Sequence, residues 1–309
     1  MKAFSKIVDL TKNFPHIVVA LGTFDGVHIG HQSIIKQAIS LAKSIHGISV
    51  VFTFSNHPLS IVAPDRAPMQ IGDNLSKERI LADLGVDVLV NIPFTKKFAK
   101  ITPEDFLILL HEHFAPRYVV VGPNFTFGYR GKGTPRMLLR EGQHYGFKAE
   151  IANAVQLEGR IVSSTRIRQL LAAGNLPLVN EFLGRPFTFS GRVIHGDRRG
   201  RLLGFPTANL AIADNRAMLP NGVYATQVLV HDKMYYGMSN IGTNPTFEGC
   251  NRRLETFIID FHDDIYDAVL QVQFLQKIRE EQKFPSAEHL VKQMHMDLKS
   301  MEKFFRENN

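Results

Sequence analysis

The spacing of apolar residues changes once along this chain, near residue 184, and that change limits the folds open to it. From residue 15 to about residue 183, short apolar runs such as "HIVVALG" and "YVVVG" alternate with helical patterns such as "HQSIIKQAISLAKSIHG". Strands separated by helices predict βαβ units and a doubly wound parallel sheet. After "LGRPF" the pattern is strand-like until a final helical stretch, "SAEHLVKQMHMDLKSMEKFF". This second part predicts an antiparallel β-barrel or sandwich with one C-terminal helix.

We therefore expect two domains, residues 1–184 and 185–309, each with a core of its own. The length of 309 residues is about that of two ordinary domains. Because the two cores are separate, we also expect the C-terminal half to fold and act without the N-terminal half. The N-terminal half alone is expected to bind its ligand, with an activity that falls if its pocket uses the interface between the halves.

The composition limits the cellular compartment and the binding partners that we expect. Cys250 is the single cysteine, which fits a reducing compartment, and no signal-peptide core or membrane-spanning apolar run is present. A cytoplasmic protein without a membrane partner is predicted. The net charge of +7 suits nucleotides as well as nucleic acids. Lysine and arginine are scattered rather than clustered, which favours phosphorylated small molecules over nucleic acid. Weak self-association stays open.

Three glycines and two histidines follow the first long apolar run. In "GTFDGVHIGHQ" the glycines are Gly22, Gly26 and Gly30, and the histidines are His28 and His31. Ligands of open parallel sheets bind beyond the carboxyl ends of the strands, where helix N-termini present free N–H groups. The first two glycines are expected to let the backbone turn, and Gly30 to admit a ligand. Histidines three apart share one face of the first turn and can donate to phosphate, although such a pair also serves as a helix cap.

A second helix start occurs at "IVSSTRIRQLLAAG". Ser163 or Ser164 is predicted to cap this helix, Thr165 to open it, and Arg166 and Arg168 to bring cations close behind. Alone, the stretch is an ordinary helix cap. Together with the histidine pair, it predicts the opposite wall of a polyphosphate site.

The combination of His-x-Gly-His with "SSTRIR" resembles the nucleotidylyltransferase superfamily pattern, with Val162 where the pattern has isoleucine. The wider context of "LGTFDGVHIGHQ", "VVGPNFTFGYRGKGT" and "LGRPF" resembles the bacterial bifunctional riboflavin kinase/FAD synthetases over nearly the whole chain. "VFTFSNHP" departs from that family's pattern before its His-Pro, so Ser55 and Asn56 are left without a role.

The resemblance implies where the first reaction occurs. The glycines and histidines of the first motif would receive the phosphates of ATP, and Asn124 would face the nucleotide or flavin. The departing pyrophosphate would be held by Ser164, Thr165 and Arg168. A phosphate monoester such as FMN is already an anionic nucleophile, so transfer of AMP to it needs positioning and charge stabilisation but no side-chain base.

In the second half, "GRVIHGDRRGRLLGFPTANL" joins a strand to a loop rich in glycine and arginine, and then to Thr207 and Asn209. Side chains two apart on an extended segment point to the same face. A hydroxyl and an amide carbonyl there can hold Mg²⁺ while phosphates complete its shell. The loop, which includes Gly196, could cover the phosphates. The arginines that could lie near them are Arg198, Arg199 and Arg201. A basic hairpin that ends in a proline turn is the alternative.

This stretch, with "NGVYA", "NIGTNPTF" and "LETFIIDF", also resembles the riboflavin kinase module of the same family. The resemblance assigns Thr207 and Asn209 to Mg-ATP, Glu255 to the catalytic base, and Arg279 to contact with the flavin ring. A base suits the chemistry, because the 5′-hydroxyl of riboflavin is a poor nucleophile and must lose a proton. Without the resemblance, Glu255 is an outward-facing polar residue on a strand. Asp267 stands where the family has glycine, which affects a turn but no assigned role.

The predicted function is therefore flavin cofactor synthesis. The C-terminal module would make FMN from riboflavin and ATP with Mg²⁺, and the N-terminal module would convert FMN and ATP to FAD and pyrophosphate. Two alternatives stay open at this point: only one activity is live, or the chain is a basic nucleic-acid-binding protein with a Rossmann-like domain. The sequence disfavours the second alternative, because it has no cluster of basic residues with interleaved aromatics.

Overall fold

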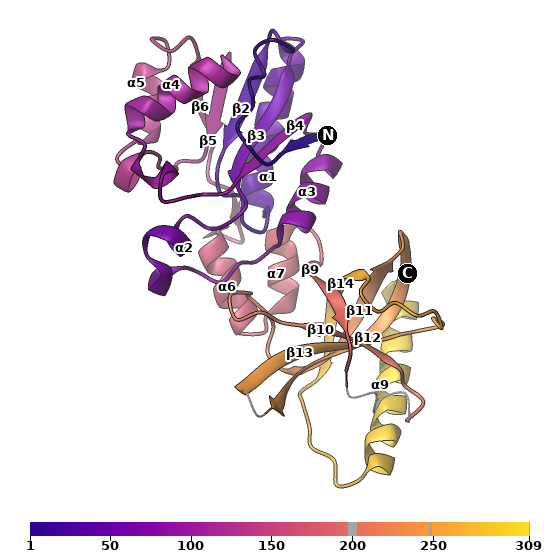
Figure 1. Ribbon diagram of the computed structural model, residues 1–309. Coiled ribbons are helices and arrows are strands. Elements are labelled where there is room, and N and C mark those ends of the chain that lie inside the picture. Colours follow the sequence, from indigo (N-terminus) through magenta and orange to yellow (C-terminus); the bar gives the residue numbers. More distant parts are fainter. Residues whose placement is uncertain (197–202, 247–248, 309) are drawn as a thin grey trace. The chain divides into compact units, whose positions relative to one another are not determined.

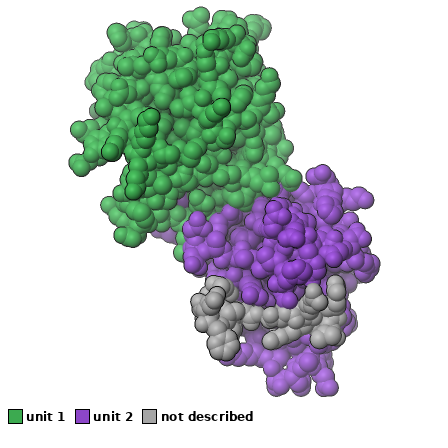
Figure 2. All heavy atoms as spheres, in the orientation of Figure 1, with its two compact units in different colours: residues 1–164 green, residues 165–309 purple. Residues whose placement is uncertain are grey.

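The computed structural model describes residues 1–196, 203–246 and 249–308 of the chain. Arg199, one of the residues expected to lie near phosphates, falls outside the described residues, as do Arg198 and Arg201. The chain divides by its contacts into two compact units, residues 1–164 and 165–309, which Figure 2 colours separately. This division assigns the helical segment that precedes residue 184 to the second unit. The functional boundary at residue 184 stays a prediction.

The first unit is built on a six-stranded sheet in the order β1-β4-β3-β2-β5-β6, in which every neighbouring pair is parallel. Its strands are β1 (Lys2–Phe4), β2 (Ile17–Leu21), β3 (Ile48–Phe54), β4 (Val88–Ile92), β5 (Tyr118–Val121) and β6 (Lys148–Ile151). Its helices are α1 (Ile29–Ser44), α2 (Leu59–Val62), α3 (Asn74–Asp83), α4 (Pro103–Phe114) and α5 (Pro135–Glu141), with 3₁₀ turns η1 (Pro64–Arg66), η2 (Phe98–Lys100) and η3 (Tyr129–Gly131). A small hairpin joins β7 (Gln156–Leu157) to β8 (Arg160–Ile161).

Helices cover both faces of this sheet, as Figure 1 shows. Alternate residues of the buried strand β2 face opposite sides: Val19 and Leu21 join the core that contains α4 and α5, while Val18 and Ala20 join the core that contains α1 and α3. A strand buried on both faces is a continuous apolar run, which is why "IVVAL" has no polar position. The predicted doubly wound parallel sheet is confirmed.

Capping residues in the local sequence determine where α4, which covers one face of the sheet, begins and ends. Thr102 is the N-cap of α4, where its side chain accepts a hydrogen bond from the N–H of Asp105, and Pro103 occupies the first helical position. Ala115 ends the helix in a left-handed conformation. The cap, the proline and the acid of the first turn are the features that the sequence predicts here.

The second unit is a closed barrel with the strand order β10-β13-β12-β11-β14-β9, in which neighbours are antiparallel. Its elements are α6 (Ser164–Ala172, which begins at the last residue of the first unit), α7 (Leu176–Leu183), β9 (Phe187–Ile194), β10 (Thr207–Ala211), β11 (Gly222–Val230), β12 (Lys233–Thr246), β13 (Gly249–Ile258), β14 (Val269–Arg279) and α9 (Ala287–Asn308). Because this sheet closes on itself, the second part of the chain is the predicted barrel and not the sandwich. The predicted C-terminal helix is α9 (Figure 1).

Helix α7 is an element that was not predicted from the sequence, and it packs against β9 and β14 of the barrel. Its Asn180 donates through Nδ2 to the carbonyl oxygen of Phe274 (3.1 Å) and accepts through Oδ1 from the N–H of Phe187 (2.7 Å). Val179 and Phe182 of α7 are fully buried. The residues just before the predicted boundary therefore belong structurally to the barrel.

Candidate active sites

The strand order of the first unit places a topological switch point between β2 and β5. From β2 the sheet continues to β3 on one side and to β5 on the other, so the segments that leave the carboxyl ends of β2 and β5 diverge. Such a switch point is where open α/β sheets bind ligands. The glycine- and histidine-rich segment follows β2, and Asn124, which is exposed, follows β5. The first motif and Asn124 thus lie beyond neighbouring strand ends.

His28 forms the N-terminus of α1. It is the N-cap residue, and its Nδ1 accepts a hydrogen bond from the N–H of His31 at 3.2 Å. The two imidazole rings stack, with centroids 3.6 Å apart. His28 is buried, with 4% of its surface exposed. A neutral ring that accepts at Nδ1 carries its proton on Nε2, which makes Nε2 a donor. The cap and the donor are therefore compatible functions of one side chain.

The glycines of this motif act differently from one another. Gly26 has φ +75°, the turn conformation that the sequence predicts for it. A Cβ on Gly22 would lie 2.8 Å from the ring of Phe24, and one on Gly30 would lie 3.1 Å from the ring of His28. Gly22 thus makes room for Phe24 without a left-handed turn, and Gly30 makes room for the capping histidine.

The same segment contains two left-handed residues that are not glycine. Phe24 has φ +47° and Val27 has φ +37°, on either side of Gly26. A β-branched residue in this region is a strong outlier, and strain of this kind persists only where the surroundings enforce it. Such outliers gather at ligand sites. No residue pattern in the sequence signals them.

The second helix start meets the first motif. The hydroxyl of Ser164 donates to the carbonyl oxygen of Asp25 at 3.1 Å, although the two residues lie 139 positions apart. The carbonyl oxygen of Val162 lies 3.5 Å from where a Cβ of Gly30 would be. Thr165 and Arg168 continue the same helix, α6, from Ser164. The structure therefore brings Ser164 to the segment that contains the histidines.

In the barrel, register places three polar residues side by side. Glu255 of β13 lies opposite Asn209 of β10 and also opposite Asn240 of β12. Residues directly opposite in an antiparallel pair point to the same face. Their neighbours Leu210 and Leu254, which also pair, are fully buried. The three side chains therefore form one row across three strands, on the face opposite the buried leucines. Asn240 lies within the "NIGTNPTF" stretch but was not singled out in the sequence.

Gly196 and Thr207 complete this part of the barrel. A Cβ on Gly196 would lie 2.6 Å from Nδ2 and 2.8 Å from Oδ1 of Asn209, so the chain passes directly over the amide. Asn209 is 7% exposed, and its Nδ2 donates to the carbonyl oxygen of Thr207 at 3.3 Å. Thr207 and Asn209 belong to β10, which confirms the extended segment predicted for them.

Inside the barrel, a chain of hydroxyl groups lies behind this row. The hydroxyl of Ser239 bonds those of Thr226 and Thr256, each at 2.9 Å, and Thr226 also donates to the carbonyl oxygen of Gly237. All three side chains are fully buried. They join β11, β12 and β13 at the register that sets Glu255 opposite Asn240, because Ser239 and Thr256 are the residues that precede and follow that pair.

Arg279, which the resemblance assigns to the flavin ring, forms an ion pair with a buried carboxylate. Its Nε lies 2.9 and 3.0 Å from the carboxylate oxygens of Asp297, and its Nη2 lies 2.8 Å from one of them. Asp297 is 2% exposed and also accepts from Gln293 of the same helix. The guanidinium carbon lies 5.5 Å from the centre of the Phe284 ring. Arg279 thus fastens α9 to β14, and "HMDLKS" contains no pattern that marks Asp297 as its partner.

At the departure from the family pattern in "IYD", Asp267 has φ +63°. The conformation is the one that glycine favours, and the turn is held by the N–H of Asp267, which donates to Val193, and by Arg192, which donates to the carbonyl of Asp267. The turn is therefore retained without the glycine.

Comparison with known proteins settles the family. The family model described as FAD synthetase matches residues 10–166, and the model described as riboflavin kinase matches residues 183–305. A relative from Escherichia coli strain K12, named bifunctional riboflavin kinase/FMN adenylyltransferase, is 38% identical over 93% of this chain and 92% of its own. The chain belongs to that family. A second member, from Listeria monocytogenes, is 36% identical over the same shares of each chain.

Membership of the bifunctional family confirms the predicted pair of activities, phosphorylation of riboflavin and adenylylation of FMN. A solved structure described as a macrolide-efflux protein from Streptococcus pneumoniae is similar over 98% of this chain and 99% of its own, with 33% identity and a TM-score of 0.85. Among the described residues, no helix has both the length and the apolar character needed to span a membrane.

Proposed function

We propose that FMN adenylylation takes place at the switch point beyond the carboxyl ends of β2 and β5. ATP phosphates would lie at the N-terminus of α1, where the positive end of the helix attracts them and the His28–His31 pair can donate to them. An oxygen of the FMN phosphate would bond to the α-phosphorus of ATP while the bond from that phosphorus to pyrophosphate breaks. No proton has to be removed, so the residues act by positioning and by stabilising charge. The supporting observation is the hydrogen bond between Ser164 and Asp25, which joins the two motifs.

Replacement of both histidines tests this assignment. In the variant His28→Ala/His31→Ala, we expect FAD formation to stop while FMN still accumulates from riboflavin. Loss of the cap alone costs about 1 kcal/mol, so His28→Ser, which retains a capping oxygen without an imidazole, is the matched control. We expect that control to unfold like the wild type and still to adenylylate FMN poorly. Undiminished FAD synthesis by the folded double variant would overturn the assignment.

We propose further that riboflavin is phosphorylated at the row formed by Asn209, Glu255 and Asn240. Glu255 would take the proton of the ribityl 5′-hydroxyl as the oxygen of that hydroxyl bonds to the γ-phosphorus of ATP and ADP departs. The register that sets Glu255 between two asparagine amides supports this proposal. Arg279 would act from the end of β14, held by its ion pair with Asp297.

Mg²⁺ is a further proposal for this site. Thr207 and Asn209 present a hydroxyl and an amide oxygen, the hard ligands that Mg²⁺ accepts together with phosphate oxygens. The parts of the chain that the structure describes contain no group of three or more His, Cys, Asp or Glu residues able to hold a metal ion. The donor set therefore fits an ion that arrives with ATP better than one bound by protein alone. When bound, Mg²⁺ would neutralise charge on the phosphates of ATP.

Replacement of Glu255 by Gln, which retains shape and removes the base, tests the kinase assignment. We expect FMN formation to fall roughly a hundredfold or more, whereas added FMN is still adenylylated. Glu280→Gln is a matched control, since that carboxylate is 75% exposed and pairs with Lys277. A kinase rate near that of the wild type in Glu255→Gln would reduce Glu255 to an ordinary strand residue.

We also infer that the protein works in the cytoplasm on small molecules, without nucleic acid. The single cysteine and the scattered lysines and arginines support that setting. Retention on DNA or RNA that weakens with salt would contradict it. Weak self-association is a further proposal, which sedimentation over a range of protein concentrations would test.

A further inference from the structure

We propose that Lys77 is a positioning residue of the adenylyltransferase site, which holds the segment 22–28 in its phosphate-binding conformation from a pocket beside that segment. This proposal rests on the proposed location of FMN adenylylation. The sequence gives no sign of it, because "SKERIL" has the pattern of an exposed helix face.

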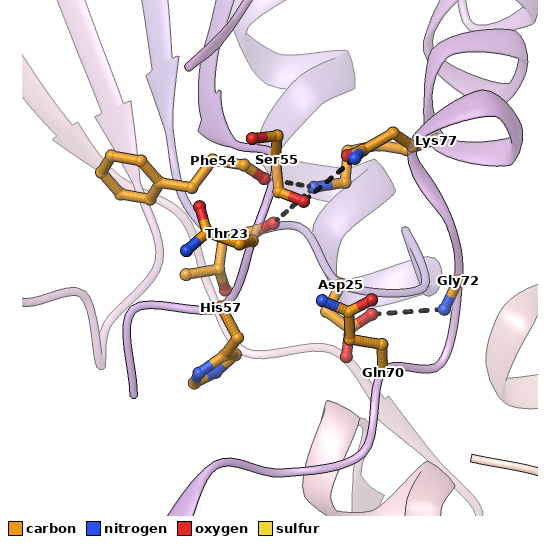
Figure 3. Close-up of a pocket in the computed structure, with 10 residues that line it drawn as sticks. Thr23, Asp25, Phe54, Ser55, His57, Gln70, Gly72 and Lys77 are labelled. Atoms are coloured by element: carbon orange, nitrogen blue, oxygen red, sulfur yellow. Dashed lines mark hydrogen bonds between the residues drawn. The ribbon is translucent and has the colours of Figure 1, made fainter. Parts of the chain in front are cut away.

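The first step is that Lys77 joins two strand ends. Its Nζ donates to the carbonyl oxygen of Phe54 at 2.9 Å and to that of Thr23 at 3.2 Å. Phe54 is the last residue of β3, and Thr23 lies just beyond the end of β2. Figure 3 shows the ammonium between these carbonyl groups. A side chain of α3 therefore holds together the carboxyl ends of the neighbouring parallel strands β2 and β3.

The second step is that Lys77 belongs to a set of contacts that hold a strained segment. Thr23 also accepts from the hydroxyl of Thr53 at 3.0 Å. The carboxylate of Asp25 accepts from the backbone N–H groups of Ile71 and Gly72, at 3.0 and 3.3 Å. Left-handed Phe24 and Val27 lie within the same few residues. Since such backbone strain persists only where its surroundings enforce it, these contacts carry the conformation.

The third step concerns charge. Lys77 lines an open pocket and keeps part of its surface accessible, yet burial lowers the pKa of its ammonium from 10.5 to about 8, and the nearby carboxylate of Asp25 opposes that fall only in part. The other titratable groups that line the pocket are Asp25 and His57. On its own helix, Asp73 accepts from the N–H of Ser76 as the N-cap of α3. The neutral amides of Asn56, Gln70 and Asn74 complete the polar wall.

The conformation of residues 22–28 should therefore depend on pH. As an ammonium, Lys77 makes charge-assisted hydrogen bonds to both carbonyl groups and attracts Asp25. Above pH 8 or so it loses its charge, so both hydrogen bonds weaken and the attraction ends. Adenylylation should therefore decline at alkaline pH, whereas riboflavin phosphorylation, which takes place in the other unit, should not follow this titration.

Two variants of the full-length protein test the proposal, with the kinase activity of each preparation as control. In Lys77→Met we expect kcat/KM for FMN adenylylation at neutral pH to fall roughly tenfold to a hundredfold, with riboflavin phosphorylation unchanged. The wild type should lose adenylylation with a midpoint near pH 8, and Lys77→Met should lack that limb. Lys77→Arg retains a cation that does not titrate here, so its adenylylation should persist above that pH.

Lys77→Met that adenylylates at the wild-type rate with the wild-type pH profile would overturn the proposal. If Lys77→Met does not fold by circular dichroism, an alkaline limb in Lys77→Arg at the same pH as in the wild type would overturn it instead. The histidine variants separate this failure from failure of the site assignment: they remain inactive in FAD formation if only the role of Lys77 is wrong. Retained FAD synthesis in His28→Ala/His31→Ala would mean that the site itself is elsewhere.

Discussion

A methyl group added at Gly196 should strike the amide of the residue proposed to hold Mg²⁺. The Cβ of Gly196→Ala would lie 2.6, 2.7 and 2.8 Å from Nδ2, Cγ and Oδ1 of Asn209. Asn209 cannot simply swing away, because it is 7% exposed and hydrogen-bonded to the backbone of Thr207. Either the amide leaves its place, or the pairing between Ile194 and Asn209 opens.

The cost follows from ordinary overpacking, which destabilises by about 1–3 kcal/mol. Each 1.36 kcal/mol is a factor of ten in rate. If the whole strain falls on the position of Asn209, kcat/KM for riboflavin phosphorylation should fall by roughly fivefold to 160-fold. If the strain falls on the strand pairing instead, the free energy of unfolding of the barrel should fall by the same amount, about 1–3 kcal/mol.

The assay is FMN formation from riboflavin and Mg-ATP, with adenylylation of added FMN by the same preparation as the internal control. A double-mutant cycle with Asn209→Ala identifies the cause, since the shorter side chain removes the clash. In that background Gly196→Ala should leave the free energy of unfolding nearly unchanged. Wild-type activity and stability in Gly196→Ala, or an equal cost in both backgrounds, would refute the reasoning.

Three further predictions concern stability. Asp297→Asn should destabilise the second unit by about 3 kcal/mol in urea, because the largely buried guanidinium of Arg279 loses its counter-charge. Lys77 has a folded pKa near 8 against 10.5 unfolded, so the unfolded chain binds more protons between these values and stability rises with pH there. Burial of the charged ammonium lowers the free energy of unfolding by roughly 3 kcal/mol below pH 8, and this cost disappears above pH 10.5. The difference in unfolding free energy between the wild type and Lys77→Met, measured against pH, should show that change. A fragment of residues 165–309 should fold and phosphorylate riboflavin, and one of residues 184–309 should be less stable by at least roughly 2 kcal/mol, because it lacks the two hydrogen bonds of Asn180.

The elements of the fold follow from the sequence where apolar periodicity and turn residues agree. The strand-like pattern after "LGRPF" includes the runs "FTFSGRVI" and "GVYATQVLV", which are β9 and β11 from end to end. The short edge strand β1 (three residues) and helix α7 were not predicted. The strand is too short to display a period. The helix does carry local signals that were missed in the sequence: Asn175 caps it, a proline lies in its first turn, and Gly184 ends it in a left-handed conformation.

Within the sites, predictability depends on whether a residue's role is local. The cap formed by His28 follows from its place before a helix, and the common face of Thr207 and Asn209 follows from two-residue spacing. Lys77 and Asp297 have no such local signal, since their partners lie on other elements: Thr23 is 54 positions from Lys77, and Arg279 is 18 positions from Asp297. Gly30 is an intermediate case, where the need for space is predictable but its occupant, the ring of His28, is not.

The two proposed sites differ as the chemistry of their nucleophiles requires. FMN brings its own negative charge, and the proposed site in the first unit offers a helix N-terminus and stacked histidines as donors, with a half-buried lysine that supports the backbone. The hydroxyl of riboflavin must lose a proton, and the row on the barrel offers a carboxylate, Glu255, between two amides. A base in the first site would stand close to the phosphates of both substrates and repel them. A second site without a base would leave the hydroxyl protonated. The absence of a proposed base in one unit and its presence in the other therefore have a single cause, the protonation state of the attacking oxygen.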